Sequence, residues 1–271
     1  VGPLLAERLW PQVTAVLTSA TIPPGLAGRV GLDASATDEL DVGSPFDVAA
    51  NGLLYCAAHL PDRRRAGADD AAREELRALI EAAGGRTLAL FTSWRAMTTS
   101  AEALGHAVPY RVLVQGQLPK SALIEAFTAE ETTCLFATMG FWQGVDVPGP
   151  TCSLVVIDRL PFSRPDDPLL SARRDRAGAD AFRVVDLPRA ATLLAQGAGR
   201  LLRSGTDRGV VAVLDPRLAR AGYRWDLVRA MPPMRRTAQR EEVVAFLAAS
   251  TSSTTAPSPR GPSEGVGLGS R

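Results

Sequence analysis

Two arginines and a glutamine near residue 200 are the strongest candidates for chemistry in this 271-residue sequence. On a helix, Gln196, Arg200 and Arg203 fall at positions i, i+4 and i+7, which places them in one stripe on one face. Arginine offers forked donors and keeps its charge, so this stripe suits a polyphosphate. The alternative is a solvated arginine face near a helix end.

Two glycines lie within the same stretch. Gly197 and Gly199 each cost about 1 kcal/mol relative to alanine inside a helix, which indicates that something packs closely against the backbone there. A dinucleotide-binding fingerprint beginning at this pair is excluded, because a leucine stands where its third glycine belongs and because the pair follows a helical stretch.

Small and hydroxyl-bearing residues follow four apolar runs of the chain. These segments are Thr18–Thr21, Thr92–Trp94, Thr138–Asp146 and Asp158–Phe162. Such residues allow a phosphate to approach the backbone closely, although Ser and Thr also end strands for ordinary turn reasons. Ligands of parallel sheets bind beyond the carboxyl ends of the strands, so these segments are expected to form the binding edge.

The apolar runs are expected to be the strands that position these segments. They cover residues 13–21, 53–58, 87–92, 112–115, 132–138, 152–158 and 209–215. Their composition is typical of strands buried on both faces. Amphipathic helices are expected over 69–83, 94–105, 120–129 and 183–203, the first capped by Asp69-Asp70 and Gly84-Gly85. The alternation predicts an α/β fold with an open, mostly parallel sheet and helices on both faces.

Several kinds of site are excluded by residues that the chain lacks. Lys120 is the only lysine, and Val114 and Pro119 stand where the glycines of a phosphate loop belong, so no Walker A motif is present. No apolar strand ends in Asp-Glu, and two histidines cannot form a histidine metal site or a convincing Ser-His-Asp triad. Three widely spaced cysteines exclude a zinc knuckle and suit a reducing compartment such as the cytoplasm.

The charge distribution and the chain ends set further expectations. Residues 159–236 contain 16 Arg and 8 Asp, a local charge of +8, which leaves 14 basic and 21 acidic residues, or −7, elsewhere. This asymmetry fits either a polyanion partner or a solvated surface. Residues 250–271 are expected to be disordered, since 16 of the 22 are Ser, Thr, Pro or Gly. No signal peptide or membrane span is expected. The missing initiator Met indicates a piece of a longer protein.

Five segments that occur in order along the chain resemble helicase motifs. They are TSAT at 18–21, FTSW at 91–94, FWQGVDVPG at 141–149, DRLPFSRPDDP at 158–168 and QGAGRLLRSGTDRGVVAVLDPR at 196–217. Together they resemble motifs III, IV, V and VI of superfamily 2 DNA helicases of the DinG/XPD type, and SPFD at 44–47 resembles the DinG branch. The resemblance covers roughly residues 13–232.

That family has two RecA-like motor domains, with ATP between them and single-stranded DNA across their tops. The resemblance implies that residues 1–47 hold the end of the first domain and a crossover, that 48–232 form the second RecA-like domain, and that 233–249 form a C-terminal helix. The missing first domain would act in cis and would hold the Walker A motif and Mg²⁺. The family's iron–sulfur cluster, where present, would also belong to that first domain.

The resemblance also implies roles for particular residues. Arg200 and Arg203 would contact the γ-phosphate as arginine fingers and Gln196 would orient that face of the site, with Gly144, Asp146 and Gly199 near the nucleotide. Ser93, Thr138 and Arg159 would hold the DNA backbone, and Trp94, Phe141 or Trp142 could stack on a base. For Phe141 and Trp142, burial under the sheet is the alternative. Ser19 and Thr21 would couple the two domains.

The implied activity is ATP-driven translocation on single-stranded DNA and unwinding of duplexes and junctions, with 5′ to 3′ polarity and association with the nucleoid. Two other functions stay open. The chain could be a non-catalytic RecA-like nucleic-acid-binding module, which the missing phosphate loop favours if the natural chain begins at Val1. It could also belong to an RNA helicase, since nothing in it decides sugar identity. The chain by itself is expected not to hydrolyse ATP.

Overall fold

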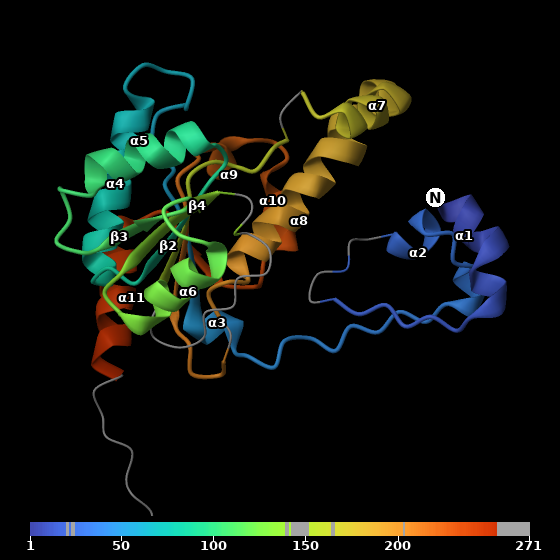
Figure 1. Ribbon diagram of the computed structural model, residues 1–271, viewed down its shortest axis with the longest axis horizontal. Coiled ribbons are helices and arrows are strands. Elements are labelled where there is room, and N and C mark those ends of the chain that lie inside the picture. Colours follow the sequence, from blue (N-terminus) through green and yellow to red (C-terminus); the bar gives the residue numbers. More distant parts are fainter. Residues whose placement is uncertain are drawn as a thin grey trace, which may run out of the picture.

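A single sheet of parallel strands organises the chain (Figure 1). The computed structural model describes residues 1–19, 22, 25–138, 141, 152–163, 166–202 and 204–253. Within them the sheet has the order β3-β4-β2-β5-β6-β1-β7, and every adjacent pair is parallel. The strands are β1 (Gly52–Cys56), β2 (Thr87–Phe91), β3 (Val112–Val114), β4 (Cys134–Thr138), β5 (Leu154–Ile157), β6 (Gly209–Val213) and β7 (Arg235–Thr237). The predicted parallel α/β sheet is confirmed.

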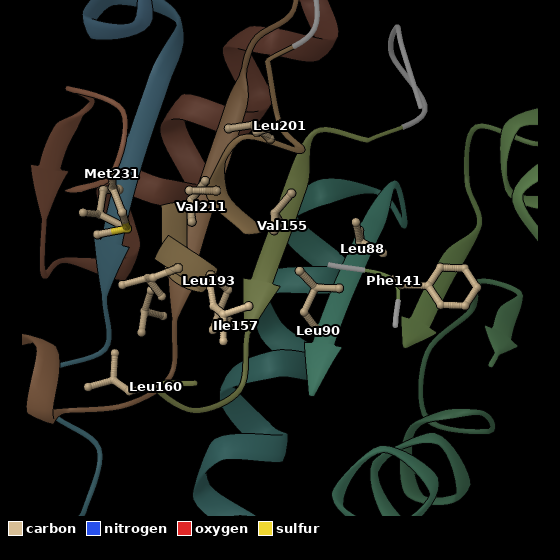
Figure 2. Packing of buried hydrophobic residues seen from close by; sticks show 14 of the residues in the cluster. Leu88, Leu90, Phe141, Val155, Ile157, Leu160, Leu193, Leu201, Val211 and Met231 are labelled. Atoms are coloured by element: carbon tan, nitrogen blue, oxygen red, sulfur yellow. The ribbon is translucent and has the colours of Figure 1, made fainter. Parts of the chain in front are cut away.

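Helices cover both faces of this sheet, as expected. The longer ones are α4 (Ala68–Ala83), α5 (Trp94–Leu104), α6 (Lys120–Ala129), α7 (Pro168–Ala177), α8 (Leu187–Ala198), α10 (Arg224–Ala230) and α11 (Arg240–Ser253). Helices α4, α5 and α11 pack on one face, where Ala89 and Phe91 of β2 point. Helices α6, α8 and α10 pack on the other, where Leu88 and Leu90 point (Figure 2). Alternate strand residues therefore enter two separate cores, which explains the continuously apolar runs.

The ends of α4 follow glycine geometry more than acidic capping. Its N-cap is Gly67, in the left-handed region and without a side-chain cap, whereas Asp69 and Asp70 lie inside the first turn. There their negative charges interact favourably with the positive end of the helix dipole. The helix ends at Gly84 with φ of 64°, as expected from the sequence. The predicted start was therefore one residue late, and the expected aspartate cap is wrong.

The helix expected over 183–203 is divided in the structure. A π-helical segment, Phe182–Asp186, precedes α8, and α8 ends at Ala198. Gly199 has ψ of 1° and serves as the C-cap, so Arg200 lies in the turn beyond the helix. The predicted helical stripe through Arg200 is therefore wrong, because the chain must turn here to enter β6 only ten residues later.

The described residues of the amino-terminal segment contribute no strand to the sheet. It contains α1 (Gly2–Arg8), α2 (Leu26–Arg29) and the 3-10 turns Trp10–Gln12 and Ala34–Ala36, and it lies apart from the sheet in Figure 1. The strand expected over 13–21 is not observed among its described residues. Val16 is 83% exposed, because no strand is placed beside it. Residues 20–21 of that run lie outside the described part.

The remaining elements are short, except at the carboxyl end. They are α3 (Val48–Asn51), the 3-10 turn Gly178–Asp180 and α9 (Arg217–Arg220). The helix expected over 233–249 is present as α11, but it begins only at Arg240, after the short edge strand β7 with its two exposed arginines. It continues to Ser253, so the expectation of disorder is wrong for residues 250–253. Across the described residues, none of the helices has the length and apolar character needed to cross a membrane.

Candidate functional site

The carboxyl ends of β4, β2 and β5 meet at one edge of the sheet. The register pairs Phe91 with Thr138, and Leu90 with Ile157. Ser93 therefore follows the end of the middle strand, while Asp158 and Arg159 follow the end of its neighbour. We name this edge of the sheet the carboxyl edge. The sequence prediction that these residues share an edge agrees with its geometry.

Ser93 and Trp94 form the start of α5 at this edge. Ser93 is the N-cap, and its Oγ accepts a hydrogen bond from the Ala96 N–H at 3.2 Å. Trp94 is 52% exposed. Gly116, with φ of 99°, lies so close to the indole that a Cβ there would be 3.4 Å from the ring. One part of the indole therefore packs on the β3–α6 loop, and the remainder is open to a ligand.

Thr138 and Phe141 lie deeper in the domain. Thr138 is buried, and both its N–H and its hydroxyl donate to Oε1 of Gln115, at 2.7 and 2.9 Å. Phe141 is buried in the core, with Nζ of Lys120 5.1 Å above its ring. Of the two alternatives for Phe141, burial holds. Trp142 lies outside the described residues.

A cavity of about 410 Å³ opens between α4, α5 and the end of β5, and we name it the arginine cavity. Four arginines and two aspartates line it, which leaves a formal charge of +2. Its lining residues are Arg63, Asp69, Ala72, Arg73, Leu76, Ser93, Arg95, Ala96, Thr99, Ser100, Asp158 and Arg159. Two of the residues expected to contact DNA, Ser93 and Arg159, thus line one polar cavity.

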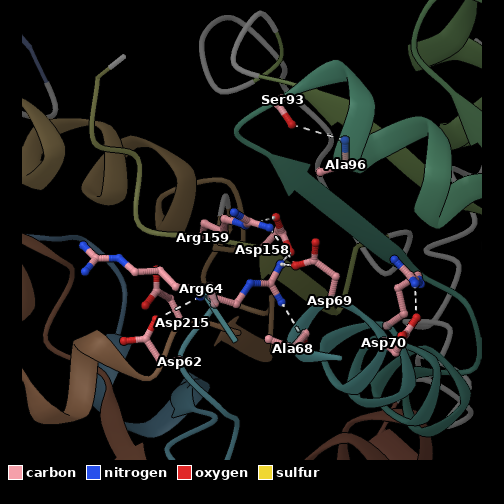
Figure 3. A network of polar contacts seen from close by, with 12 residues as sticks. Asp62, Arg64, Ala68, Asp69, Asp70, Ser93, Ala96, Asp158, Arg159 and Asp215 are labelled. Carbon is pink, nitrogen blue, oxygen red and sulfur yellow. Dashed lines mark hydrogen bonds and ion pairs between the residues drawn. The ribbon is translucent and has the colours of Figure 1, made fainter. Parts of the chain in front are cut away.

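Arg63 is the buried anchor of this cavity, and it is not among the site residues expected from the sequence. Its Nη2 lies 2.5 Å from Oδ1 of Asp158 and 3.4 Å from Oδ1 of Asp69. Figure 3 labels both aspartates. The side chains of Arg63 and Asp158 are only 7% and 9% exposed. Arg63 belongs to a run of three arginines shortly after the apolar run 53–58, so the rule that functional residues follow strands could have found it.

Two buried carboxylates hold the loop that follows β5. Burial raises the pKa of Asp158, and the guanidinium groups of Arg63 and Arg159 oppose that rise. Burial also acts to raise the pKa of Asp215, but hydrogen bonds from Arg217 and from the Leu160 N–H outweigh it, so this pKa lies below its usual range. The bond from Leu160 to Asp215 is 3.0 Å long and ties the end of β5 to that of β6.

Arg200, one of the two arginine-finger candidates, lies at the other edge of the sheet. Leu201 packs beside Gly209, the first residue of β6, where an added Cβ would be 2.8 Å from the leucine. Arg200, at the preceding position, is therefore at the edge formed by the amino ends of the strands, which we name the amino edge. Figure 2 labels Leu201 and Leu160 at opposite ends of the strands. Five-residue strands separate the two edges by roughly 16 Å. Gln196, in the last turn of α8, and its C-cap Gly199 belong to the same edge as Arg200.

Some expected site residues are not described by the structure. They are Thr21, Gly144, Asp146 and Arg203. Ser19 lies in the amino-terminal segment, outside its helices. Its expected coupling role stays a prediction.

Comparison with known proteins identifies relatives of the whole chain. A family model described as "Helicase C-terminal domain" matches residues 76–234. The chain is 50% identical over 257 residues to ATP-dependent helicase DinG of Mycobacterium tuberculosis (strain ATCC 25618 / H37Rv), which covers 91% of this chain and 39% of the relative. It is 39% identical over 241 residues to ATP-dependent DNA helicase YoaA of Escherichia coli (strain K12), with 86% and 38% covered. The chain thus spans about two fifths of these relatives.

Solved structures share the fold. S. tokodaii Xpd4 superposes with a TM-score of 0.51 at 17% identity, over 69% of this chain and 39% of that one. An XPD helicase gives 0.53 at 16% identity, over 69% and 36%. The all-parallel sheet with helices on both faces is the architecture of a RecA-like helicase motor domain.

The chain belongs to the helicase C-terminal domain family and is of the DinG/XPD type. The resemblance read from the sequence motifs is thereby confirmed.

Proposed function

We propose that this chain is the second motor domain of an ATP-dependent DNA helicase and that its two sheet edges serve two ligands. The amino edge, with Gln196, Gly199 and Arg200, faces the nucleotide held by a first motor domain in cis. The carboxyl edge faces single-stranded DNA. The relatives named as ATP-dependent helicases support this assignment.

The observation that carries the proposal is the arginine cavity at the carboxyl edge. Its charge of +2 and its forked guanidinium donors suit a phosphodiester. Ser93 lines the cavity, and the half-exposed Trp94 beside it offers a face for base stacking. Phosphate contacts and a stacking platform are what a sequence-independent track on single-stranded DNA requires.

The described residues of the amino edge fit a polyphosphate. A guanidinium from Arg200 and an amide from Gln196 supply donors, and the turn after α8 places Arg200 beyond the end of the helix. We assign Mg²⁺ to the first motor domain, as the resemblance to the helicase family implies. ATP supplies the phosphoryl group that is transferred to water. Arg200 would neutralise charge developing on it, a contribution of about 10³ to 10⁵ in rate in comparable systems.

The test is the Arg200→Ala variant of the full-length protein, assayed for DNA-stimulated ATP hydrolysis. We expect kcat to fall by at least about 100-fold with little change in KM, because the contact strengthens in the transition state. Arg200→Lys should rescue only partly, since an ammonium cannot reproduce the fork. Arg229→Ala, on the exposed side of α10, is the matched control. Wild-type kcat in a folded Arg200→Ala protein would show that the finger assignment is wrong.

The finer parts of the proposal concern the nucleic acid. They are 5′ to 3′ unwinding, action at DNA junctions, association with the nucleoid and preference for DNA over RNA. Fluorescence anisotropy with a labelled single-stranded DNA, competed by DNA or RNA of the same sequence, tests the last. RNA that competes at least as well as DNA would favour the alternative of an RNA helicase.

A further inference from the structure

The ion pairs of the arginine cavity differ in their exposure. Arg63 and Asp158 form the buried pair described above. Arg159 instead donates from Nη2 to Oδ1 of Asp69 at 2.7 Å, and these side chains are 32% and 56% exposed (Figure 3). A half-exposed ion pair contributes little stability and is readily exchanged, whereas a buried one is not. Arg159 is therefore a cavity arginine that can change its partner, and Asp69 is its partner in the structure.

A second acceptor for Arg159 is already in place. Its Nε lies 3.6 Å from Oδ2 of Asp158, and neither of these buried atoms has a hydrogen bond. Buried polar atoms without partners are rare and unfavourable. If the guanidinium turned from Asp69 toward Asp158, these two atoms could form the missing bond. Loss of the Asp69 contact would then be partly compensated inside the protein.

We propose that Asp69 is an internal competitor for the DNA phosphate: it occupies Arg159 until a phosphodiester enters the cavity and displaces it. This inference rests on the proposed DNA track. Arg95, which also lines the cavity, adds positive charge that attracts the phosphate. Arg63 keeps Asp158 in position during the exchange, because that pair is buried.

The functional consequence is a limit on the affinity for DNA. A motor that steps along a strand must release each phosphate, and a carboxylate that returns to Arg159 favours release. A half-exposed pair of this kind corresponds to a change in affinity of up to about fivefold. The exchange also alters counterion release. The phosphate loses a condensed cation when it binds Arg159, whereas the Asp69 carboxylate takes one up when it leaves Arg159.

The experiment measures binding of this chain to a fluorescein-labelled oligothymidylate by anisotropy at several salt concentrations. Asp69→Asn should bind about two- to fivefold more tightly than wild type, and the slope of log Kd against log salt should steepen by up to about one. Glu81→Gln is the matched control. It removes the same charge from α4, but at the far end, where Glu81 pairs with Arg77 outside the cavity. It should bind like wild type.

A second comparison uses the Arg159→Ala background, in which the gain from Asp69→Asn should disappear. Persistence of the gain there, or equal tightening by Glu81→Gln, would overturn the inference, because net charge alone would then explain the effect. If Arg159→Ala weakens binding but Asp69→Asn has no effect, the competitor is refuted and the DNA track survives. Failure of the wild-type chain and of every variant to bind at low salt would refute both.

Discussion

The buried pair between Arg63 and Asp158 gives the sharpest test of how the site is built. Its atoms are 2.5 Å apart and its side chains are less than one tenth exposed. Replacing Arg63 by Met leaves the Asp158 carboxylate buried, with only Arg159 near it at 3.6 Å. Breaking a buried pair costs about 3 to 5 kcal/mol, and the residual arginine places our expectation near the lower limit, about 3 kcal/mol. For a domain of this size, that corresponds to a decrease in Tm of roughly 6 to 12 °C.

Urea unfolding followed by tryptophan fluorescence, together with differential scanning calorimetry, measures this loss. Asp158→Leu should be similarly destabilised, because it leaves Arg63 buried without its carboxylate, whereas the double variant should lose less than the sum of the two. Arg73→Met is the control, since Arg73 lines the same cavity but pairs with the exposed Asp70, and its loss should stay below about 1 kcal/mol. If Arg63→Met is no less stable than Arg73→Met, the pair does not anchor the site.

Three further predictions concern the fold. Because the pKa of Asp215 is lowered, its carboxylate stabilises the fold fully above the unfolded pKa of about 4, and this contribution is lost as the pH falls through the folded pKa. Asp215→Asn should lower the free energy of unfolding by about 2 kcal/mol near neutral pH. In urea titrations, this difference from wild type should shrink below about pH 4. Burial raises the pKa of Cys56 to about 11 and that of Cys134 to about 12. Neither thiol should therefore react with an aromatic disulfide reagent near pH 8 until urea unfolds the chain. Rapid labelling of the native protein at these two thiols would contradict their burial. Gly85→Ala should lower the free energy of unfolding by more than about 2 kcal/mol. The reason is that residue 85 has a φ of 81°, and a Cβ there would clash with the Thr132 carbonyl. An unchanged Tm would disagree with that geometry.

The central strands and their order of occurrence could be predicted from the sequence for a local reason. A strand that is buried on both faces needs apolar side chains at every position. The strands β2, β4, β5 and β6 can therefore be recognised in the sequence as continuous apolar runs. The glycine at the end of α4 is also a local requirement of backbone conformation. The edge strand β7 was missed, because its two exposed arginines carry no such signal.

The amino-terminal run shows the opposite case. Residues 13–17 have the composition of a strand, but Val16 is exposed and no strand is formed. A strand exists only where a neighbour satisfies its backbone groups, and that neighbour is a property of the tertiary structure.

Sequence motifs alone were sufficient to identify the helicase family and to single out Ser93, Arg159 and Arg200. Only the tertiary structure placed Ser93 and Arg159 in one cavity and Arg200 at the opposite edge, because the direction of the parallel strands decides which loops meet. It also ended α8 before Arg200, since the chain must turn there to enter β6. Arg63 reaches Asp158 across 95 residues of sequence. Burial and pairing over that separation depend on packing, which no local pattern encodes.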